Sequence, residues 1–302
     1  MKLNIIPDYF FILRPMLHLP VWTIAILGYY GTGPDHPGWG RLVLVLVLGT
    51  LLAGAVFVLN QIYDIESDRI NNKLFFLAEG IISVRMAWLI VICLNIISLI
   101  IGFALSIKVG IVSVLIVLLG IFYSAPPAAL KNRAWPAVFT NAIGHGSLIY
   151  LLGHVAAGGR WLPGVFKSLP YFIAVAAVYI GTTGPDLKGD KISGKQTIAV
   201  IYGEKATALI AFSFYLLALG AGFWQSDIPF LIAALAAGPF YVWGSFAGGT
   251  GRVFMAIKIS VITLSLVAGF FFPPYLPFLI ILIAVTRIYH KQKFGLAYPT
   301  IK

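Results

Sequence analysis

The sequence predicts an all-helical integral membrane protein, a bundle of nine or ten transmembrane helices. Of its 302 residues, 60% are hydrophobic and only 10% are charged, whereas a soluble domain carries about 25% charged residues. Apolar runs of about 20 residues recur along the chain, which is the length that crosses a hydrocarbon core of about 30 Å as a helix. Because these runs do not alternate with polar residues, a transmembrane β-barrel is excluded. The single cysteine excludes an internal disulfide and a metal site built from several cysteines.

Ten apolar runs are the candidate helices. The first contains Arg14 and lacks the small-residue cleavage site of a signal peptide, so we expect it to be the first span. Only Phe272-Pro273-Pro274 separates the last two runs, and the fourth run is short, so the count is nine or ten. The runs occupy residues 9–31, 41–63, 81–106, 109–124, 135–156, 165–183, 204–223, 228–247, 252–272 and 274–290.

The chain is expected to form a single membrane domain, residues 1–302, with two related halves at about 1–134 and 135–302. An apolar helix, two Asp residues spaced by four, a basic polar loop and a second apolar helix occur at 41–100 and again at 165–223. Internal repeats of this kind often surround a central site in membrane proteins.

The charge distribution predicts the orientation in the membrane. The two longest polar connections, 64–80 and 184–203, are separated by four spans and therefore lie on the same side. With ten spans, 17 of the 21 Lys and Arg residues fall on or near that side, the exceptions being Arg41, Lys108, Arg160 and Lys167. Because positive residues concentrate in cytoplasmic loops, we expect the protein to lie in the cell membrane with this side facing the cytoplasm. The net charge of +11 is then explained by topology, and no nucleic-acid partner is expected.

Negative charge is scarce, and seven of the ten carboxylates fall in two short windows, 64–79 and 186–204. In the first cluster, Asn60, Asp64 and Asp68 recur every four residues and share one helix face, rising by about 6 Å per step. Mg²⁺ prefers a few carboxylates together with phosphate oxygens and water, so the pattern indicates a phosphate ligand bridged by metal ions. The alternative is a solvated helix end paired with Arg69 and Lys73.

The second cluster also contains two Asp residues spaced by four. Asp186 and Asp190 are interleaved with Lys188, Lys191 and Lys195. Carboxylates for a metal and ammonium groups for phosphate oxygens are the components of a diphosphate site. A polar turn with surface salt bridges is the alternative. Two such clusters on one face of a charge-poor protein favour the diphosphate site.

A third group lies on the same face. Lys131 and Arg133 either contact the diphosphate or only determine topology, and the sequence does not separate these two interpretations. Tyr123 either faces a cationic intermediate with its ring or belongs to the interfacial aromatic belt. Arg14 is an intramembrane ionisable residue and hence a functional candidate, with snorkelling to the interface as the alternative.

Other intramembrane features carry weaker signals. His18 and His145 are too isolated to be assigned as metal ligands. The small residues Gly144, Gly146 and Gly153 predict close packing between helices.

These motifs resemble those of the UbiA superfamily of intramembrane prenyltransferases. The first cluster matches the family pattern NxxxDxxxD, the second matches its DxxxD, and Tyr123-Ser124 before Pro126-Pro127 also fits. Nearly the whole chain is covered in motif order and spacing. The sequence departs from the family in residues 74–80, where an Arg-Pro pair and a Pro-Ser-Gly run are common, and at Thr183, where many members have a third Asp.

The resemblance implies an all-helical fold, typically with nine spans around a central cavity and a cytoplasmic cap made by the two Asp-rich loops. It implies Mg²⁺-dependent transfer of a prenyl group from a prenyl diphosphate to a hydrophobic, aromatic or hydroxyl-bearing acceptor, through an allylic cation, in quinone or membrane-lipid biosynthesis. The expected metal ligands are Asp64, Asp68, Asp186 and Asp190, with Tyr123 beside the cation. The expected diphosphate contacts are Asn60, Arg69, Lys73, Lys131, Lys188 and Arg14.

Two other classes of protein remain open from the sequence. A secondary transporter would also have repeats and charges within the membrane, but it predicts carboxylates deep in the spans, whereas these gather at one face. A non-catalytic isoprenoid-binding membrane protein with degenerate motifs is compatible with the departures from the family pattern.

Overall fold

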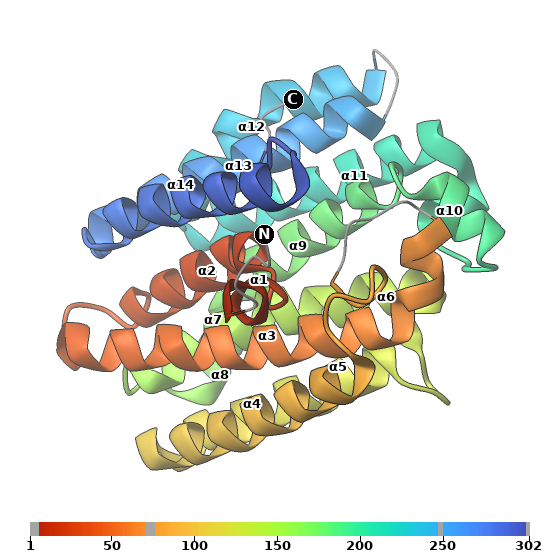
Figure 1. Ribbon diagram of the computed structural model, residues 1–302. Helices are drawn as coiled ribbons and strands as arrows, with labels where there is room; N and C mark the ends of the chain where they lie inside the picture. Colours follow the sequence, from red (N-terminus) through yellow and green to blue (C-terminus); the bar gives the residue numbers. More distant parts are fainter. Residues whose placement is uncertain (1–5, 71–75, 247–249, 300–302) are drawn as a thin grey trace.

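The computed structural model describes residues 6–70, 76–246 and 250–299. Within them the protein is a bundle of α-helices with no β-strand, and Figure 1 shows the long helices lying alongside one another. The prediction of an all-helical fold is therefore confirmed. The helices are α1 (Ile6–Phe11), α2 (His18–Tyr30), α3 (Gly38–Ile70), α4 (Val84–Leu105), α5 (Ile107–Ser124), α6 (Ala134–Asn141), α7 (Ile149–Ala156), α8 (Trp161–Lys167), α9 (Leu169–Thr182), α10 (Leu187–Ile192), α11 (Ile198–Gln225), α12 (Ile228–Phe246), α13 (Thr250–Phe271) and α14 (Tyr275–Phe294).

In the described part of the chain, fewer helices than the sequence predicted are long and apolar enough to cross a membrane. Each of the ten apolar runs lies in one helix or in consecutive helices. Among the described residues, seven helical spans are long and apolar enough to cross a membrane, or eight if α8 and α9, which bend by 43°, form one span. The count of nine or ten therefore stays a prediction.

Several helices are interrupted where the sequence places unusual residues. The first run breaks between α1 and the short 3₁₀ helix η1 (Pro15–Leu17), where Arg14 adopts a left-handed conformation with φ of 55°. A π-helical segment, η3 (Ala142–Leu148), joins α6 to α7. Helix α11 kinks at Gly203, where φ is +77°. Breaks of this kind place polar groups inside a bundle that is otherwise regular.

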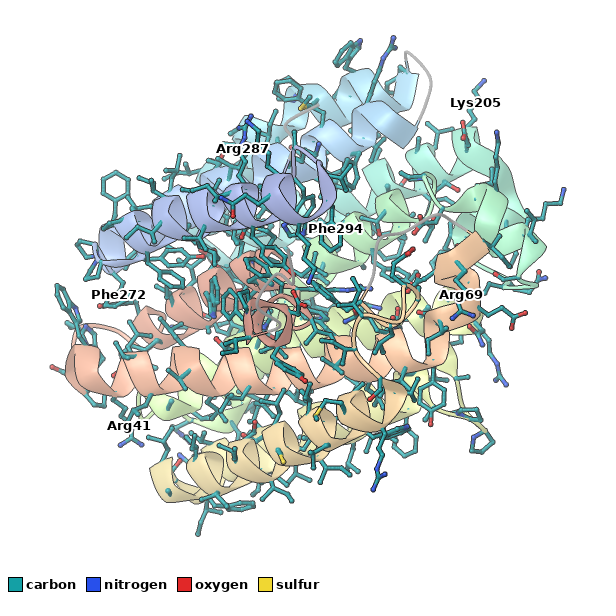
Figure 2. The ribbon with its side chains drawn as sticks, viewed as in Figure 1. Arg41, Arg69, Lys205, Phe272, Arg287 and Phe294 are labelled. Carbon is teal, nitrogen blue, oxygen red and sulfur yellow. The ribbon has the colours of Figure 1, made fainter. Side chains whose placement is uncertain are left out.

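Helix α3 extends beyond the thickness of a bilayer. Its 33 residues span about 50 Å at 1.5 Å per residue, whereas the hydrocarbon core measures about 30 Å. Arg41 and Arg69 mark its two ends in Figure 2. At the end near Arg41, the guanidinium donates to the carbonyl oxygens of Leu105 and Ala156 at distances of 2.9 and 2.7 Å. These carbonyls belong to the last residues of α4 and α7, which have no hydrogen-bond partner within their own helices. The opposite end carries the first Asp cluster, and Figure 1 shows α10 beside it.

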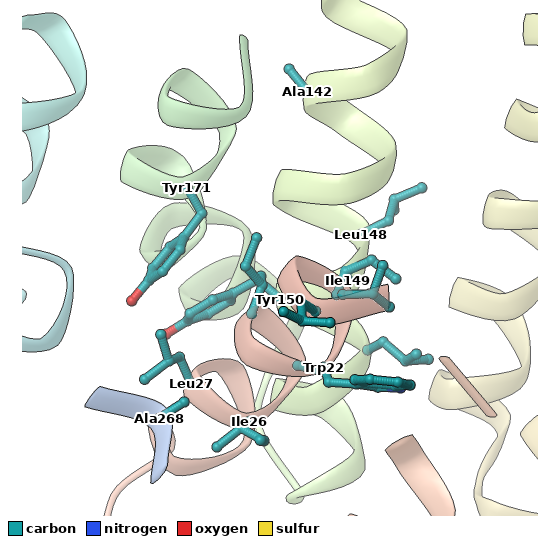
Figure 3. Packing of buried hydrophobic residues seen from close by; sticks show 14 of the residues in the cluster. Trp22, Ile26, Leu27, Ala142, Leu148, Ile149, Tyr150, Tyr171 and Ala268 are labelled. Atoms are coloured by element: carbon teal, nitrogen blue, oxygen red, sulfur yellow. The ribbon is translucent and has the colours of Figure 1, made fainter. Parts of the chain in front are cut away.

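The core of the bundle is packed around α2, α7 and α9, whose buried side chains appear together in Figure 3. Glycine permits the closest approach, because a Cβ atom on Gly153 of α7 would lie 2.1 Å from the carbonyl oxygen of Ala25 in α2. Gly146 makes a similar approach to α9, so the packing role predicted for these two glycines is confirmed. The nearest atom to a Cβ on Gly144 is a leucine methyl at 3.4 Å, which is ordinary contact.

The two ends of the described chain are joined by a buried ion pair. Asp8 of α1 is 1% exposed, and its carboxylate accepts from Tyr289 and pairs with Lys293, both on α14. Phe11 stacks on Tyr289 with ring centroids 3.8 Å apart. These contacts fix α1, and hence the break at Arg14 that follows it, against the last helix.

Candidate active site

Two adjoining compartments lie inside the bundle. One is an apolar cavity of about 550 Å³, and the other is a polar pocket of about 170 Å³ at the end of α3 that carries the first Asp cluster. Six residues line both compartments and form what we call the neck: Arg14, Asn60, Tyr123, Tyr179, Thr182 and Asp186.

The polar pocket brings the two predicted Asp clusters together. Asp64 and Asp68 project from the last turns of α3, while Asp186 and Asp190 belong to the start of α10. Each pair is spaced by four residues on a helical segment, which places both carboxylates on one face. All four therefore line a single pocket, although 118 residues of sequence separate Asp68 from Asp186.

Two lysines neutralise Asp64. The Nζ atoms of Lys131 and Lys195 lie 3.0 and 2.9 Å from the same oxygen, Oδ1 of Asp64. Lys195 also donates to the hydroxyl of Ser67 at 3.1 Å. Two ammonium groups contact one carboxylate, so this part of the pocket carries a net positive charge. A net positive charge favours the binding of an anionic ligand.

Local backbone structure explains how the two lysines reach Asp64. Lys131 lies in a 3₁₀ turn, η2 (Leu130–Asn132), which follows the two prolines after α5. Lys195 follows Gly194, whose φ of +72° favours glycine and lets the chain turn back after α10. The amide of Gln196 then donates to the carbonyl of Asn132 at 3.0 Å, so the two loops are tied to each other.

Burial and charge act in opposite directions on these lysines. For Lys131, burial lowers the pKa below its ordinary value, and the nearby charge of Asp64 only partly opposes that shift. For Lys195, burial also lowers the pKa, but the charges of Asp64, Asp190 and Asp68 together outweigh it and raise the pKa overall. Lys195 therefore carries its positive charge firmly at neutral pH.

Arg14 occupies the neck. Its Nη2 atom lies 3.9 Å from Oδ2 of Asp68, and its backbone is one of only a few non-glycine positions with positive φ among the described residues. An L-residue in this conformation costs about 1–2 kcal/mol, and such strain is often found at functional sites. The chain break at Arg14 thus turns an intramembrane arginine toward the pocket.

The remaining neck residues come from α3, α5 and α9. The hydroxyl of Tyr123 donates to that of Tyr179 at 3.4 Å. The carbonyl oxygen of Asn60 accepts from Lys131 at 3.4 Å. Tyr123 and Asn60 line both compartments and so stand between the charged pocket and the apolar cavity.

Three predicted diphosphate contacts are placed differently or lie outside the described residues. Lys188 is exposed and does not line the pocket. Arg69 is exposed and donates to the carbonyl oxygen of Ala78 at 3.0 Å. Lys73 lies outside the described residues.

Lys195 is the pocket residue that the sequence did not single out from its neighbours. Helical spacing could have excluded Lys188 from the pocket, because Lys188 is two residues from Asp186 and so points to the opposite side of α10. Lys195 instead follows the turn at Gly194, and its amide donates to the carbonyl of Asp190 at 2.9 Å. A glycine C-cap after a short helix therefore indicates which lysine returns to the carboxylates.

The donor atoms of the polar pocket fit Mg²⁺ chemistry. Carboxylate oxygens are hard ligands, and Mg²⁺ is usually held by one or two of them together with substrate phosphates. Among the described residues, no three His, Cys, Asp or Glu side chains are grouped closely enough to hold a metal by themselves. The pocket therefore fits a metal that shares its coordination with an anionic ligand.

Comparison with known proteins gives a consistent result. The sequence model of the UbiA prenyltransferase family matches residues 21–260. The chain is 30% identical to 2-acyl-4-prenylphloroglucinol 6-prenyltransferase of Humulus lupulus, an alignment that covers 58% of this chain but only 44% of that protein. It is 28% identical to homogentisate phytyltransferase of Synechocystis, over 72% of this chain and 76% of that protein.

A solved structure shares the fold. The UbiA homologue of Archaeoglobus fulgidus bound to GPP and Mg²⁺ superposes with a TM-score of 0.74 at 22% identity, over 88% of this chain and 98% of that one.

Proposed function

The chain belongs to the UbiA prenyltransferase family, and from that premise we propose that it transfers a prenyl group from a prenyl diphosphate to a hydrophobic acceptor that is aromatic or bears a hydroxyl group. The observation that carries this proposal is the pair of compartments. A polar pocket with four carboxylates and three cationic side chains adjoins, at the neck, an apolar cavity of about 550 Å³. A prenyl diphosphate has the same division into a charged head and an apolar chain.

The polar pocket would bind the diphosphate. Lys131, Lys195 and Arg14 surround it with hydrogen-bond donors that charge-assisted contacts to phosphate require. In the structure, the two lysines contact Asp64. We propose that they pass to diphosphate oxygens when the donor binds, which frees Asp64 to act as a metal ligand.

The four aspartates would hold the metal. Asp64 and Asp68 on one side and Asp186 and Asp190 on the other give two carboxylate pairs facing one pocket. Mg²⁺, when bound there, supplies positive charge that stabilises the leaving diphosphate. The A. fulgidus homologue, described as bound to GPP and Mg²⁺, supports the same assignment for this chain.

The neck would hold the carbon atom that reacts. With the diphosphate in the polar pocket and the chain in the cavity, the first carbon of the donor lies beside Tyr123, Asn60 and Arg14. An electron-rich ring such as that of Tyr123 can stabilise positive charge on an allylic group. The apolar walls exclude water, which would otherwise capture the cation.

The acceptor and the setting of the reaction are also proposals. The names of the phloroglucinol and homogentisate enzymes support an aromatic acceptor, and we place the reaction in quinone or membrane-lipid biosynthesis. The excess of basic residues around the Asp loops supports a cap that faces the cytoplasm.

The test uses the full chain purified in lipid nanodiscs with Mg²⁺. Radiolabelled prenyl diphosphates of increasing length are combined with homogentisate, a 2-acylphloroglucinol or a glyceryl phosphate lipid, and product and released diphosphate are measured. We expect Asp68→Ala to abolish product without lowering the unfolding temperature by more than a few degrees. Glu66→Ala is the matched control, because Glu66 is exposed on the same turn of α3 and does not line the pocket.

Three results would overturn the assignment. Full Mg²⁺-dependent turnover by Asp68→Ala would remove the role of the Asp cluster. Binding of the donor by the wild type without release of diphosphate, with any acceptor or with water, would show a non-catalytic isoprenoid-binding protein. Ion-coupled solute uptake into vesicles in the absence of prenyl transfer would show a transporter.

A further inference from the structure

A single histidine stands in the apolar cavity just beyond the neck. His145 belongs to the π-helical segment η3 and lines the cavity, as does Asn141 four residues earlier. Its ring stacks on that of Phe57, with centroids 5.8 Å apart and planes 14° from parallel. Phe57 precedes Asn60 of the neck by three residues on α3, so the stacked pair lies about one helical turn, roughly 5 Å, below the neck.

The imidazole of His145 has no hydrogen-bond partner among the described residues, and the side chain is only partly buried. The nearby His18 differs, because its two nitrogens are paired with the carbonyl oxygens of Arg14 and Thr50 at 3.2 and 3.1 Å. His18 is therefore part of the scaffold. His145 instead presents unused hydrogen-bonding capacity to the cavity.

Several other polar side chains of the deep cavity are engaged within the chain. Thr23 pairs with Ser265 at 2.9 Å, and Tyr215 donates to the carbonyl of Ala234 at 3.0 Å. The described charged residues that line the cavity, Arg14 and Asp186, both belong to the neck. Below the neck, His145 is thus the one described side chain of the cavity lining that can both bind a polar ligand and accept a proton.

The backbone explains why the ring faces the cavity. A Cβ atom on Gly146 would lie 2.7 Å from the Cα of Phe172, so η3 packs directly on the backbone of α9 on the side next to His145. The wider π-helical turn is a feature often found at functional sites. The close contact at Gly146 fixes the rotation of the segment and so the direction of the neighbouring ring.

We propose that His145 binds the hydroxyl group of the acceptor and takes up the proton that prenyl transfer releases. This inference rests on the proposed function. The acceptor would lie in the cavity beside Phe57, opposite the diphosphate with respect to the first carbon of the donor. A phenol or alcohol is the class of acceptor that this arrangement fits, because a carboxylate acceptor has no proton to lose.

The step balances as follows for a hydroxyl acceptor. The bond between the first carbon of the donor and the diphosphate oxygen breaks, and its electron pair leaves with the diphosphate. A lone pair of the acceptor oxygen forms the new carbon–oxygen bond. The proton of that hydroxyl passes to the ring nitrogen of His145, which later returns it to water. For attack by a ring carbon of a phenol, the π electrons form the new carbon–carbon bond and the phenolic proton passes to His145, which gives a cyclohexadienone. The attacked carbon then loses its ring hydrogen as a proton and the oxygen is reprotonated, so the aromatic ring is restored and one proton is released overall.

Two substitutions separate hydrogen bonding from proton uptake. His145→Phe keeps an aromatic ring against Phe57 but removes both functions, whereas His145→Gln keeps a hydrogen-bonding group and removes the base. His154→Gln is the matched control, because His154 lies on α7 of the same helical run and does not line the cavity. The donor is geranyl diphosphate, and homogentisate and a 2-acylphloroglucinol are the phenolic probes.

We expect His145→Phe to lower kcat at least 100-fold, within the range of about 10²–10⁴ that a general base contributes, and to raise the KM of the phenol about fivefold. We expect His145→Gln to restore the KM but not kcat. Mg²⁺-dependent binding of geranyl diphosphate, measured without acceptor, stays within twofold of the wild type in both. His154→Gln leaves the KM and kcat for both phenols within twofold.

The inference fails if a wild type that transfers prenyl groups is matched within twofold by His145→Phe in both KM and kcat. It also fails if His145→Phe loses donor binding as much as transfer, since that indicates a structural role, or if His145→Gln has full kcat. A wild type that neither transfers to any acceptor of the panel nor releases diphosphate refutes the proposed function instead, so the two failures are distinguishable.

Discussion

Exchanging one lysine in the loop after α9 tests whether the polar pocket binds a diphosphate. Lys195 contacts Asp64 within the pocket, whereas Lys188, seven residues earlier, is exposed and outside it. The substitutions Lys195→Met and Lys188→Met remove the same charge from the same loop and keep a similar length of side chain. A difference between them therefore reports position and not net charge.

The structure sets the size of the expected effect. Asp64 keeps Lys131 at 3.0 Å when Lys195 is removed, so no buried carboxylate is left unpaired and the stability loss should be about 1 kcal/mol or less. A hydrogen bond to a charged group contributes about 1.5–3 kcal/mol net, which corresponds to roughly 10- to 150-fold in binding. We expect Lys195→Met to raise the KM for the donor by that factor. Lys188→Met should change it by less than twofold.

The assay is Mg²⁺-dependent release of diphosphate in nanodiscs, at several donor concentrations and at two ionic strengths. High salt screens a general surface attraction, so an effect of Lys195→Met that persists at 0.5 M salt indicates direct contact. Equal effects of the two substitutions would refute the placement of the diphosphate, because they would mean that only the summed charge of the loop matters. A larger effect of Lys188→Met would refute it more directly.

Further predictions concern the metal and the packing of the bundle. Chelation of divalent cations should abolish turnover, and calorimetry should show tight Mg²⁺ binding only when inorganic diphosphate is present, since no described group of three acidic or imidazole side chains holds a metal alone. Gly146→Val should lower the unfolding temperature by several degrees because its Cβ would overlap backbone atoms, whereas Gly220→Ala, where nothing lies within 4 Å, should leave it unchanged or raise it. Lys293→Met should destabilise the chain by about 3 kcal/mol because it leaves buried Asp8 without its cation; the exposed Lys291→Met is its control and should cost less than 0.5 kcal/mol.

The parts of the site that follow helical spacing were predictable. Spacing by four places Asp64 and Asp68 on one face of α3, and the same rule places Asp186 and Asp190 together at the start of α10. The scarcity of carboxylates made both pairs conspicuous. The juxtaposition of the two pairs was predicted from their common side of the membrane, which requires only a count of spans between them.

The parts that depend on turns were not predictable from spacing. Lys188 and Lys195 are equally basic in sequence, and only the reversal of the chain at Gly194 decides which one returns to Asp64. Arg14 is similar, since hydropathy indicates one continuous first span, whereas the chain breaks there and adopts a left-handed conformation. Local backbone conformation of this kind is set by contacts with distant elements, in this case by the attachment of α1 to α14 through Asp8.

The separation of charge in this protein suits the proposed reaction to the interior of a membrane. The four aspartates and the cations that face them line the polar pocket, with Arg14 and Asp186 in the neck itself, while the cavity beyond the neck is lined mainly by apolar side chains. Strong electrostatic stabilisation of a leaving diphosphate requires dense charge, but survival of an allylic cation requires the absence of water and of strong nucleophiles. The two environments adjoin at the neck, whose residues line both compartments. The imidazole of His145, which we propose as the base, lies just beyond the neck and would take up a proton without bringing an anion into the apolar compartment.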